Sequence, residues 1–116
     1  MNPRLATRTE HPAAIVWLDR QHALIARAHE GHPTVTEVDR EADPSVQYLL
    51  RVAHEAADCD RVVIAGPDSA RLDFERAFVA LYHRPDRLID VGVSFQPRRH
   101  DLIEQLEMID PVRASH

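Results

Sequence analysis

The sequence predicts a single α/β domain in which helices pack on the faces of one five-stranded mixed sheet. Three strand-like segments joined by short connections come first, and helix-like and strand-like segments then alternate to the end of the chain. The length of 116 residues is near the commonest size of one domain, so a second domain is not expected.

The first three strands are predicted from short apolar or alternating runs. Ala14–Leu18 is apolar throughout and ends at Asp19, which is typical of a central strand buried on both faces. A second strand is predicted at Ala23–Ala28, and the residues from His29 to Pro33 predict a turn. Thr34–Asp39 alternates between apolar and polar residues, so we expect a half-exposed strand.

The pattern then changes to a helical period, and residues 43–45 predict a helix start. The apolar face of this first helix consists of Val46, Leu49, Leu50, Ala53 and Ala57. The apolar strand Arg61–Ala65 leads to a second helix, whose inner face consists of Ala70, Phe74, Ala77, Phe78 and Leu81. A fifth strand is predicted at Leu88–Val91, and Pro97 suits the first turn of a third helix. The inner face of that helix consists of Leu102, Ile103, Leu106 and Ile109.

The predicted order is therefore β-β-β-α-β-α-β-α. An antiparallel meander followed by right-handed crossovers has the topology of the ribonuclease H-like motif. We expect the domain to span residues 13–109, with a flexible leader at 1–12 and a frayed tail at 110–116. No apolar run approaches the roughly 20 residues that span a bilayer, and the first twelve residues lack the apolar core of a secretory signal.

Three segments resemble one family of short bacterial translational machinery proteins. They are Ala14–Asp19 (AIVWLD), Val62–Pro67 (VVIAGP) followed by Ser-Ala-Arg at 69–71, and Ile89–Val93 (IDVGV). That family is similar in turn to the middle domain of archaeal and eukaryotic class 1 release factors and of Pelota. The resemblance covers roughly residues 13 to 108 and implies a fold used on the ribosome.

The release chemistry of those factors is not expected here. True release factors carry a Gly-Gly-Gln motif between the third strand and the first helix, where this chain has Asp-Arg-Glu-Ala-Asp-Pro at residues 39–44. The chain has three glycines, Gly31, Gly66 and Gly92, and no two are adjacent. The resemblance therefore predicts a non-enzymatic, translation-associated interaction module.

The charge distribution argues against a general nucleic-acid binder, because the net charge is −5. Four arginines, Arg84, Arg87, Arg98 and Arg99, are nevertheless predicted to form a local basic patch that contacts rRNA or another part of the ribosome. Cations at a helix N-terminus oppose the helix dipole, so Arg98 and Arg99 are not placed there for helix stability. Solvated surface arginines are the alternative reading.

The turn from Gly66 to Ser69 is a second candidate site. The N-terminus of the following helix suits an anion, which makes Gly66, Asp68 and Ser69 candidates for anion binding. However, Pro67 removes a donor and Asp68 would repel a phosphate. A structural role is favoured, in which Gly66 lets the chain turn and Asp68 or Ser69 caps the helix.

A metal-dependent nuclease acting on RNA or DNA is the main alternative function. Asp19 and Asp68 follow the first and fourth strands, where nucleases of this fold hold two metals about 4 Å apart. The first two turns of the first helix contain no acid, and Glu55 should lie about 15 Å from the helix start. Asp19 is then more simply a turn residue.

The remaining polar residues predict no metal, cofactor or small-molecule site. The eight histidines lack zinc-ligand spacing, and the single Cys59 lies between two acids that raise the pKa of its thiol. One cysteine excludes an internal disulfide and favours the cytoplasm. Trp17 is expected in the core, whereas Tyr48 and Tyr82 are expected at its boundary. A homo-oligomeric scaffold is a third possibility, with residues 34–38 as a candidate edge strand.

Overall fold

The computed structural model describes residues 13–29, 32–91 and 97–109, so the expected leader and tail lie outside the described residues. The elements in chain order are β1 (Ala13–Leu18), β2 (His22–His29), β3 (His32–Asp39), α2 (Ser45–Glu55), β4 (Arg61–Ala65), α3 (Asp68–Tyr82), the short 3-10 helix η1 (Pro85–Arg87), β5 (Leu88–Asp90) and α4 (Arg99–Ile109). The five strands form one mixed sheet in the order β3-β2-β1-β4-β5. The predicted α/β class and element order are confirmed.

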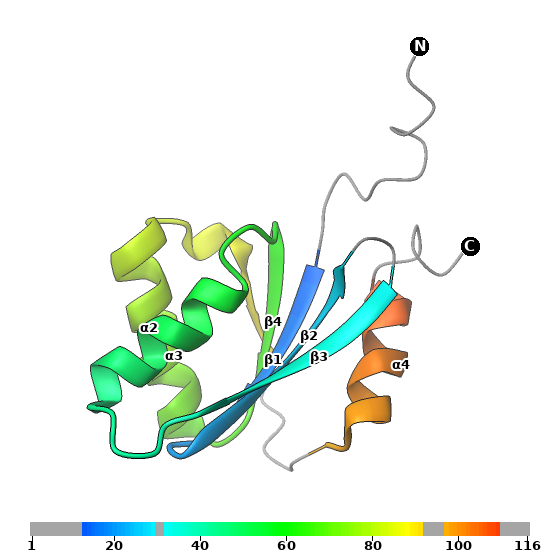
Figure 1. Cartoon of the computed structure of the whole chain (residues 1–116). Coiled ribbons are helices and arrows are strands. Elements are labelled where there is room, and N and C mark those ends of the chain that lie inside the picture. Colours follow the sequence, from blue (N-terminus) through cyan, green and yellow to red (C-terminus); the bar gives the residue numbers. More distant parts are fainter. Residues whose placement is uncertain (1–12, 30–31, 92–96, 110–116) are drawn as a thin grey trace.

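Strand β1 occupies the centre of the sheet. It pairs antiparallel with β2, where Trp17 lies opposite Leu24, and parallel with β4, where Trp17 lies opposite Ala65. All six of its residues are buried, because α2 and α3 cover one face of the sheet and α4 covers the other (Figure 1). The predicted central strand, with Trp17 in the core, is therefore confirmed.

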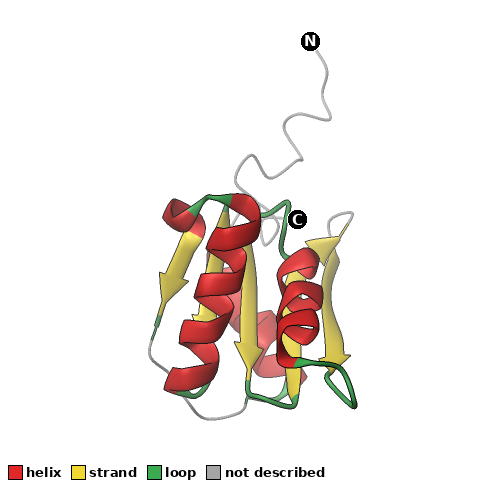
Figure 2. Ribbon diagram, turned by 90° about the vertical axis from the view of Figure 1, so that its left-hand side faces the viewer, coloured by secondary structure: helices red, strands yellow, loops and turns green. Residues whose placement is uncertain are grey.

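The two faces of the sheet bury two separate apolar clusters. Alternate residues of a strand point to opposite faces, so Val16 and Leu18 pack with α2 and α3 while Ile15 packs with α4. The larger cluster includes Tyr48, Val52, Phe74 and Phe78, and the smaller includes Leu102 and Leu106. Figure 2 views the molecule from the side on which α2 and α3 lie next to each other. No described helix combines the length and apolar character that a membrane crossing needs.

The inner faces of α2 and α3 differ from those predicted. Tyr48 is buried rather than at the boundary, and its hydroxyl donates a hydrogen bond to the Asp19 carbonyl at 3.0 Å. Because Tyr48 faces the sheet, α2 is rotated so that Val46 is 65% exposed; Leu81 of α3 is 45% exposed. The prediction that Val46 and Leu81 belong to the inner faces is wrong. Tyr82 is half-buried, as expected of a boundary residue.

Two predicted boundaries also need correction. The turn expected from His29 to Pro33 is shorter, since the hairpin pairs His29 with His32 and Ala28 with Pro33. Pro33 is tolerated because β3 is an edge strand. Pro97 precedes α4 instead of lying in its first turn, because the Asp101 carboxylate accepts the Arg98 backbone N–H at 3.0 Å and the helix begins at Arg99.

The ends of β1 and β4 meet at Gly66. Its backbone has φ +123°, a conformation that glycine adopts without a Cβ penalty. A Cβ built on Gly66 would lie 2.0 Å from the carbonyl oxygen of Leu18, so no larger residue fits unless one of the two strands moves.

Replacing Gly66 with alanine should lower the free energy of unfolding by about 3 kcal/mol or more, since backbone strain and a backbone clash add. The matched control is Ser69→Ala, because Ser69 is exposed and makes no capping hydrogen bond; it should change stability by less than about 0.5 kcal/mol. Urea unfolding of both variants measures the difference. Equal midpoints for the two would contradict the close approach of Gly66 to Leu18.

Candidate functional site

The carboxyl ends of the three parallel strands gather polar groups at one edge of the sheet. Asp19 follows β1, the turn from Gly66 to Ser69 follows β4, and Asp90 ends β5. Ligand sites of open α/β sheets lie outside the carboxyl ends of such strands. This edge is therefore the first place to test for a site.

Arg71 is the centre of this edge, and the sequence reading missed it. The Arg71 side chain is 10% exposed, and its guanidinium group forms ion pairs with Asp68 and Asp90. Its Nε also donates to the Gly66 carbonyl at 2.8 Å. Arg71 thus connects the start of α3 to the ends of β4 and β5. One feature of the sequence indicates this role: Arg71 directly follows Ala70, which belongs to the inner face of the predicted helix.

The candidate anion turn has a carboxylate at its helix start, and that carboxylate pairs with Arg71. It belongs to Asp68, whose side chain is 85% exposed, and no side chain caps the first turn of α3. Ser69 is exposed. A phosphate bound at the start of α3 would therefore lie beside the carboxylate of Asp68, with that of Asp90 on the other side of Arg71.

Asp19 stabilises the turn between β1 and β2. Its Oδ1 accepts the backbone N–H of Gln21 at 2.7 Å and that of His22 at 2.8 Å. The His22 ring also lies against Trp17, with 5.4 Å between ring centroids. This is the turn role anticipated from the sequence.

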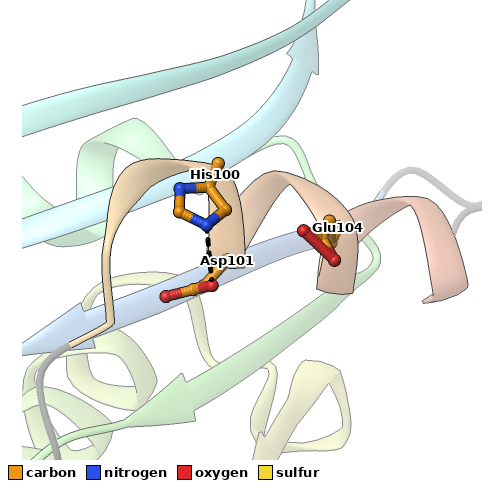
Figure 3. Close-up of side chains that lie close together, drawn as sticks. All are labelled: His100, Asp101 and Glu104. Carbon is orange, nitrogen blue, oxygen red and sulfur yellow. Dashed lines mark ion pairs between the residues drawn. The ribbon is translucent and has the colours of Figure 1, made fainter.

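The described part of the chain contains one group of three His, Cys, Asp or Glu side chains whose ligand atoms lie within 4.8 Å of one another: His100, Asp101 and Glu104 of α4 (Figure 3). It includes neither acid of the nuclease alternative. The Nε2 of His100 lies 3.3 Å from Asp101 Oδ1, and the other oxygen of Asp101 accepts the Arg98 N–H. The group lies in the first turns of α4, where the helix dipole and two arginines oppose a bound cation.

The four candidate contact arginines fall into two pairs on opposite sides of the molecule. Arg84 lies just before η1 and Arg87 lies in it, on the side of α2 and α3. Arg98 and Arg99 lie at the start of α4, on the other face of the sheet (Figure 1). Arg84 binds Asp86 through two hydrogen bonds of 3.0 and 2.8 Å. The side chain of Arg98 is 82% exposed, and its Nε lies 3.9 Å from Asp101.

Several arginines have a structural task that the sequence reading missed. They donate to carbonyl groups at or just after the carboxyl ends of helices, where the helix dipole favours a cation. The pairs are Arg27 with the carbonyl of Glu55, Arg87 with that of Ala57 and Arg61 with that of Ile109. The Arg27 guanidinium also hydrogen-bonds Asp58 and thereby lowers the pKa of that carboxyl. Arg87 is therefore already engaged within the fold.

Cys59 is unsuited to nucleophilic chemistry. Burial raises the pKa of its thiol to about 11, and Asp58 and Asp60 act in the same direction while Arg27 opposes them. The side chain is 1% exposed. A protonated, buried thiol is inert, which agrees with the sequence expectation, although burial contributes more than the two acids.

Comparisons with known proteins reveal similarity only at the level of structure. No protein-family model and no curated protein sequence matches the chain. Pelota from Archaeoglobus fulgidus superposes with a TM-score of 0.60 and 18% identity, covering 97% of this chain and 36% of that one. Pelota from Thermoplasma acidophilum gives 0.59 and 17%, covering 84% and 32%. The archaeal translation termination factor aRF1 gives 0.55 and 16%, covering 90% and 37%.

The chain therefore spans about a third of the length of these solved structures. At this level of identity the likeness establishes a shared fold. The fold predicted from the resemblance to Pelota and the release factors is confirmed.

Replacing Arg71 with methionine should lower the free energy of unfolding by about 2–4 kcal/mol, because the Gly66 carbonyl and the Asp90 carboxylate lose their shared donor. The exposed Asp68 contributes little. Arg71→Lys should recover only part of the loss, since an ammonium group lacks the planar fork. Urea unfolding tests this, with Arg98→Met as the control that changes stability by less than about 0.5 kcal/mol. If both methionine variants are equally stable, the connecting role of Arg71 is wrong.

Proposed function

We propose that this protein is a non-enzymatic interaction module that associates with the translation apparatus, and that it contacts ribosomal RNA through the start of α4. The observation that carries the proposal is the fold shared with Pelota and with an archaeal translation termination factor, over nearly the whole of this chain. Fold alone does not assign function, so the proposal rests on what the residues add to it.

The loop between β3 and α2 supports a role without release chemistry. It has no Gly-Gly-Gln sequence. Arg40 Nε donates to the Asp43 carbonyl at 2.9 Å, and Arg51 binds the Asp43 carboxylate at 2.6 Å and the Asp39 carbonyl at 3.1 Å. The Arg40 backbone N–H also bonds the Gln21 carbonyl at 2.8 Å. A loop held at both ends in this way suits a structural connection.

The start of α4 is the better of the two arginine pairs for contact with RNA. The side chains of Arg98 and Arg99 are 82% and 58% exposed, and their carboxylate partners Asp101 and Glu37 lie at 3.9 and 3.8 Å. Exposed ion pairs of this length contribute little, so a phosphate can replace them. Arg99 also donates to the Val35 carbonyl at 3.0 Å, so Arg98 is the freer of the two. Arg84 and Arg87 remain second candidates, because each binds a group of the protein at 3.0 Å or less, whereas the ion pair of Arg98 is 3.9 Å long.

An acidic protein with a few exposed arginines should bind RNA locally and with strong dependence on salt. The net charge of −5 opposes long-range attraction to phosphate. Binding then depends on contacts whose number sets the slope of affinity against salt. A ribosomal partner also implies a location in the cytoplasm, which agrees with the single cysteine.

Co-sedimentation of the purified protein with ribosomes, over a series of salt concentrations, tests this proposal. We expect binding at low salt that weakens as salt rises. The double variant Arg98→Glu, Arg99→Glu should lose about tenfold or more in affinity, and each arginine should contribute about one unit to the salt slope.

The charge-matched control for Arg98→Glu alone is Arg20→Glu, because the Arg20 side chain has no partner among the described residues. It should retain binding apart from a small effect of net charge. Absence of binding at every salt concentration would overturn the proposal. Loss of binding in Arg84→Glu instead would move the contact to the other arginine pair.

A further inference from the structure

The outer surface between α2 and α3 carries an apolar groove. Its floor and sides are formed by Val46, Leu49, Leu50, Ala77, Ala80 and Leu81. We call this surface the α2/α3 groove. Helices α2 and α3, which line the groove, cover the face of the sheet opposite α4 (Figures 1 and 2), so the groove is separate from the start of α4.

Two of the apolar side chains that line the groove are turned away from the core. The helical period assigns Val46 and Leu81 to inner faces, yet they are 65% and 45% exposed. Scattered exposed aliphatic residues are ordinary, whereas several that line one concave surface mark an interaction site.

Two neighbouring side chains of opposite charge lie on the α3 side of the groove. Asp73 and Arg76 both line the groove and lie three residues apart on α3. Neither side chain pairs with another residue in the part of the chain that the structure describes. A complementary partner would place an acid near Arg76 and a base near Asp73, next to each other along α3.

We propose that a second copy of this chain occupies the α2/α3 groove and forms a two-fold symmetric dimer. In a two-fold arrangement the same surface meets itself, so Asp73 of each copy faces Arg76 of the other and both charges are satisfied at once. Ala77 and Ala80 are small enough for the two α3 helices to approach closely. A typical interface of about 800 Å² per partner would take roughly a tenth of the 6969 Å² surface of the chain.

The β3 edge is less suited to pairing between copies. Arg99 donates to its Val35 carbonyl at 3.0 Å, and Pro33 offers no N–H. Both features block an exposed edge strand. The α2/α3 groove has no such cover among the described residues.

Sedimentation equilibrium over a wide concentration series tests the dimer. The mass of the wild-type protein should rise with concentration from the 13.2 kDa of one chain toward twice that value. Leu81→Glu should keep the protein monomeric, because it places a charge on the apolar wall of the groove. Met108→Glu is the matched control: Met108 is 80% exposed on α4, and this variant should associate as the wild type does.

Charge reversal distinguishes a second copy from any other partner surface. Asp73→Arg or Arg76→Asp alone should raise the dissociation constant about tenfold or more, because like charges then face each other. The double reversal Asp73→Arg, Arg76→Asp restores opposite charges in both pairs and should restore association. Circular dichroism and thermal unfolding of each variant confirm that it is folded.

Three outcomes would overturn the proposal. They are a monomeric mass at every concentration, association that is insensitive to Leu81→Glu, and a double reversal that fails to restore what the single reversals lose. The proposed ribosome contact lies at the start of α4, whereas the groove lies between α2 and α3. Each proposal can therefore fail without the other, and each has its own experiment.

Discussion

The parallel pairing of β1 with β4, closed by the contact between Gly66 and the Leu18 carbonyl, is the constraint on which the rest of the structure depends. Because β1 is buried on both faces, the position of its end sets the positions of the segments that contact this end. The Asp19 turn begins there, and the Asp19 carbonyl accepts the hydroxyl of Tyr48 and so sets the rotation of α2. The turn at Gly66 in turn sets the start of α3, which Arg71 joins to β5.

Arginine is the other organising feature. A guanidinium offers several donors in a fixed plane, and this protein uses them largely on its own backbone. Arg27, Arg61 and Arg87 bind carbonyls near helix ends, and Arg71 binds the carbonyl of Gly66. The chain has no lysine, and a lysine would form these hydrogen bonds to backbone carbonyls less well than arginine does. Among the candidate contact arginines, Arg98 is 82% exposed and its ion pair is 3.9 Å long, which favours the start of α4 as the proposed RNA contact.

The element order and the burial of β1 could be predicted because they depend on patterns within short segments. An apolar run such as Ala14–Leu18 needs cover on both faces wherever it lies, so the prediction required no tertiary information. The position of Tyr48 could not be predicted this way, because its burial depends on an acceptor in a distant turn. Arg71 was missed for a similar reason: its two carboxylates come together only when β4 and β5 pair. Val46 and Leu81 fit a helical period, but the buried Tyr48 of α2 and the buried Phe74 and Phe78 of α3 set which faces of these helices point toward the sheet.

Different faces of this small domain carry different features: the carboxyl edge of the sheet holds the fold together, the start of α4 is the proposed RNA contact, and the α2/α3 groove is the proposed site of a second copy. Association with the translation apparatus is the proposal on which the RNA contact depends. The most direct test is the distribution of a tagged copy in sucrose gradients of cell lysates, taken under several growth and stress conditions. If the proposed association holds, a fraction of the protein migrates with ribosomal particles and moves to the top of the gradient at high salt. Protein that stays at the top under every condition would contradict it.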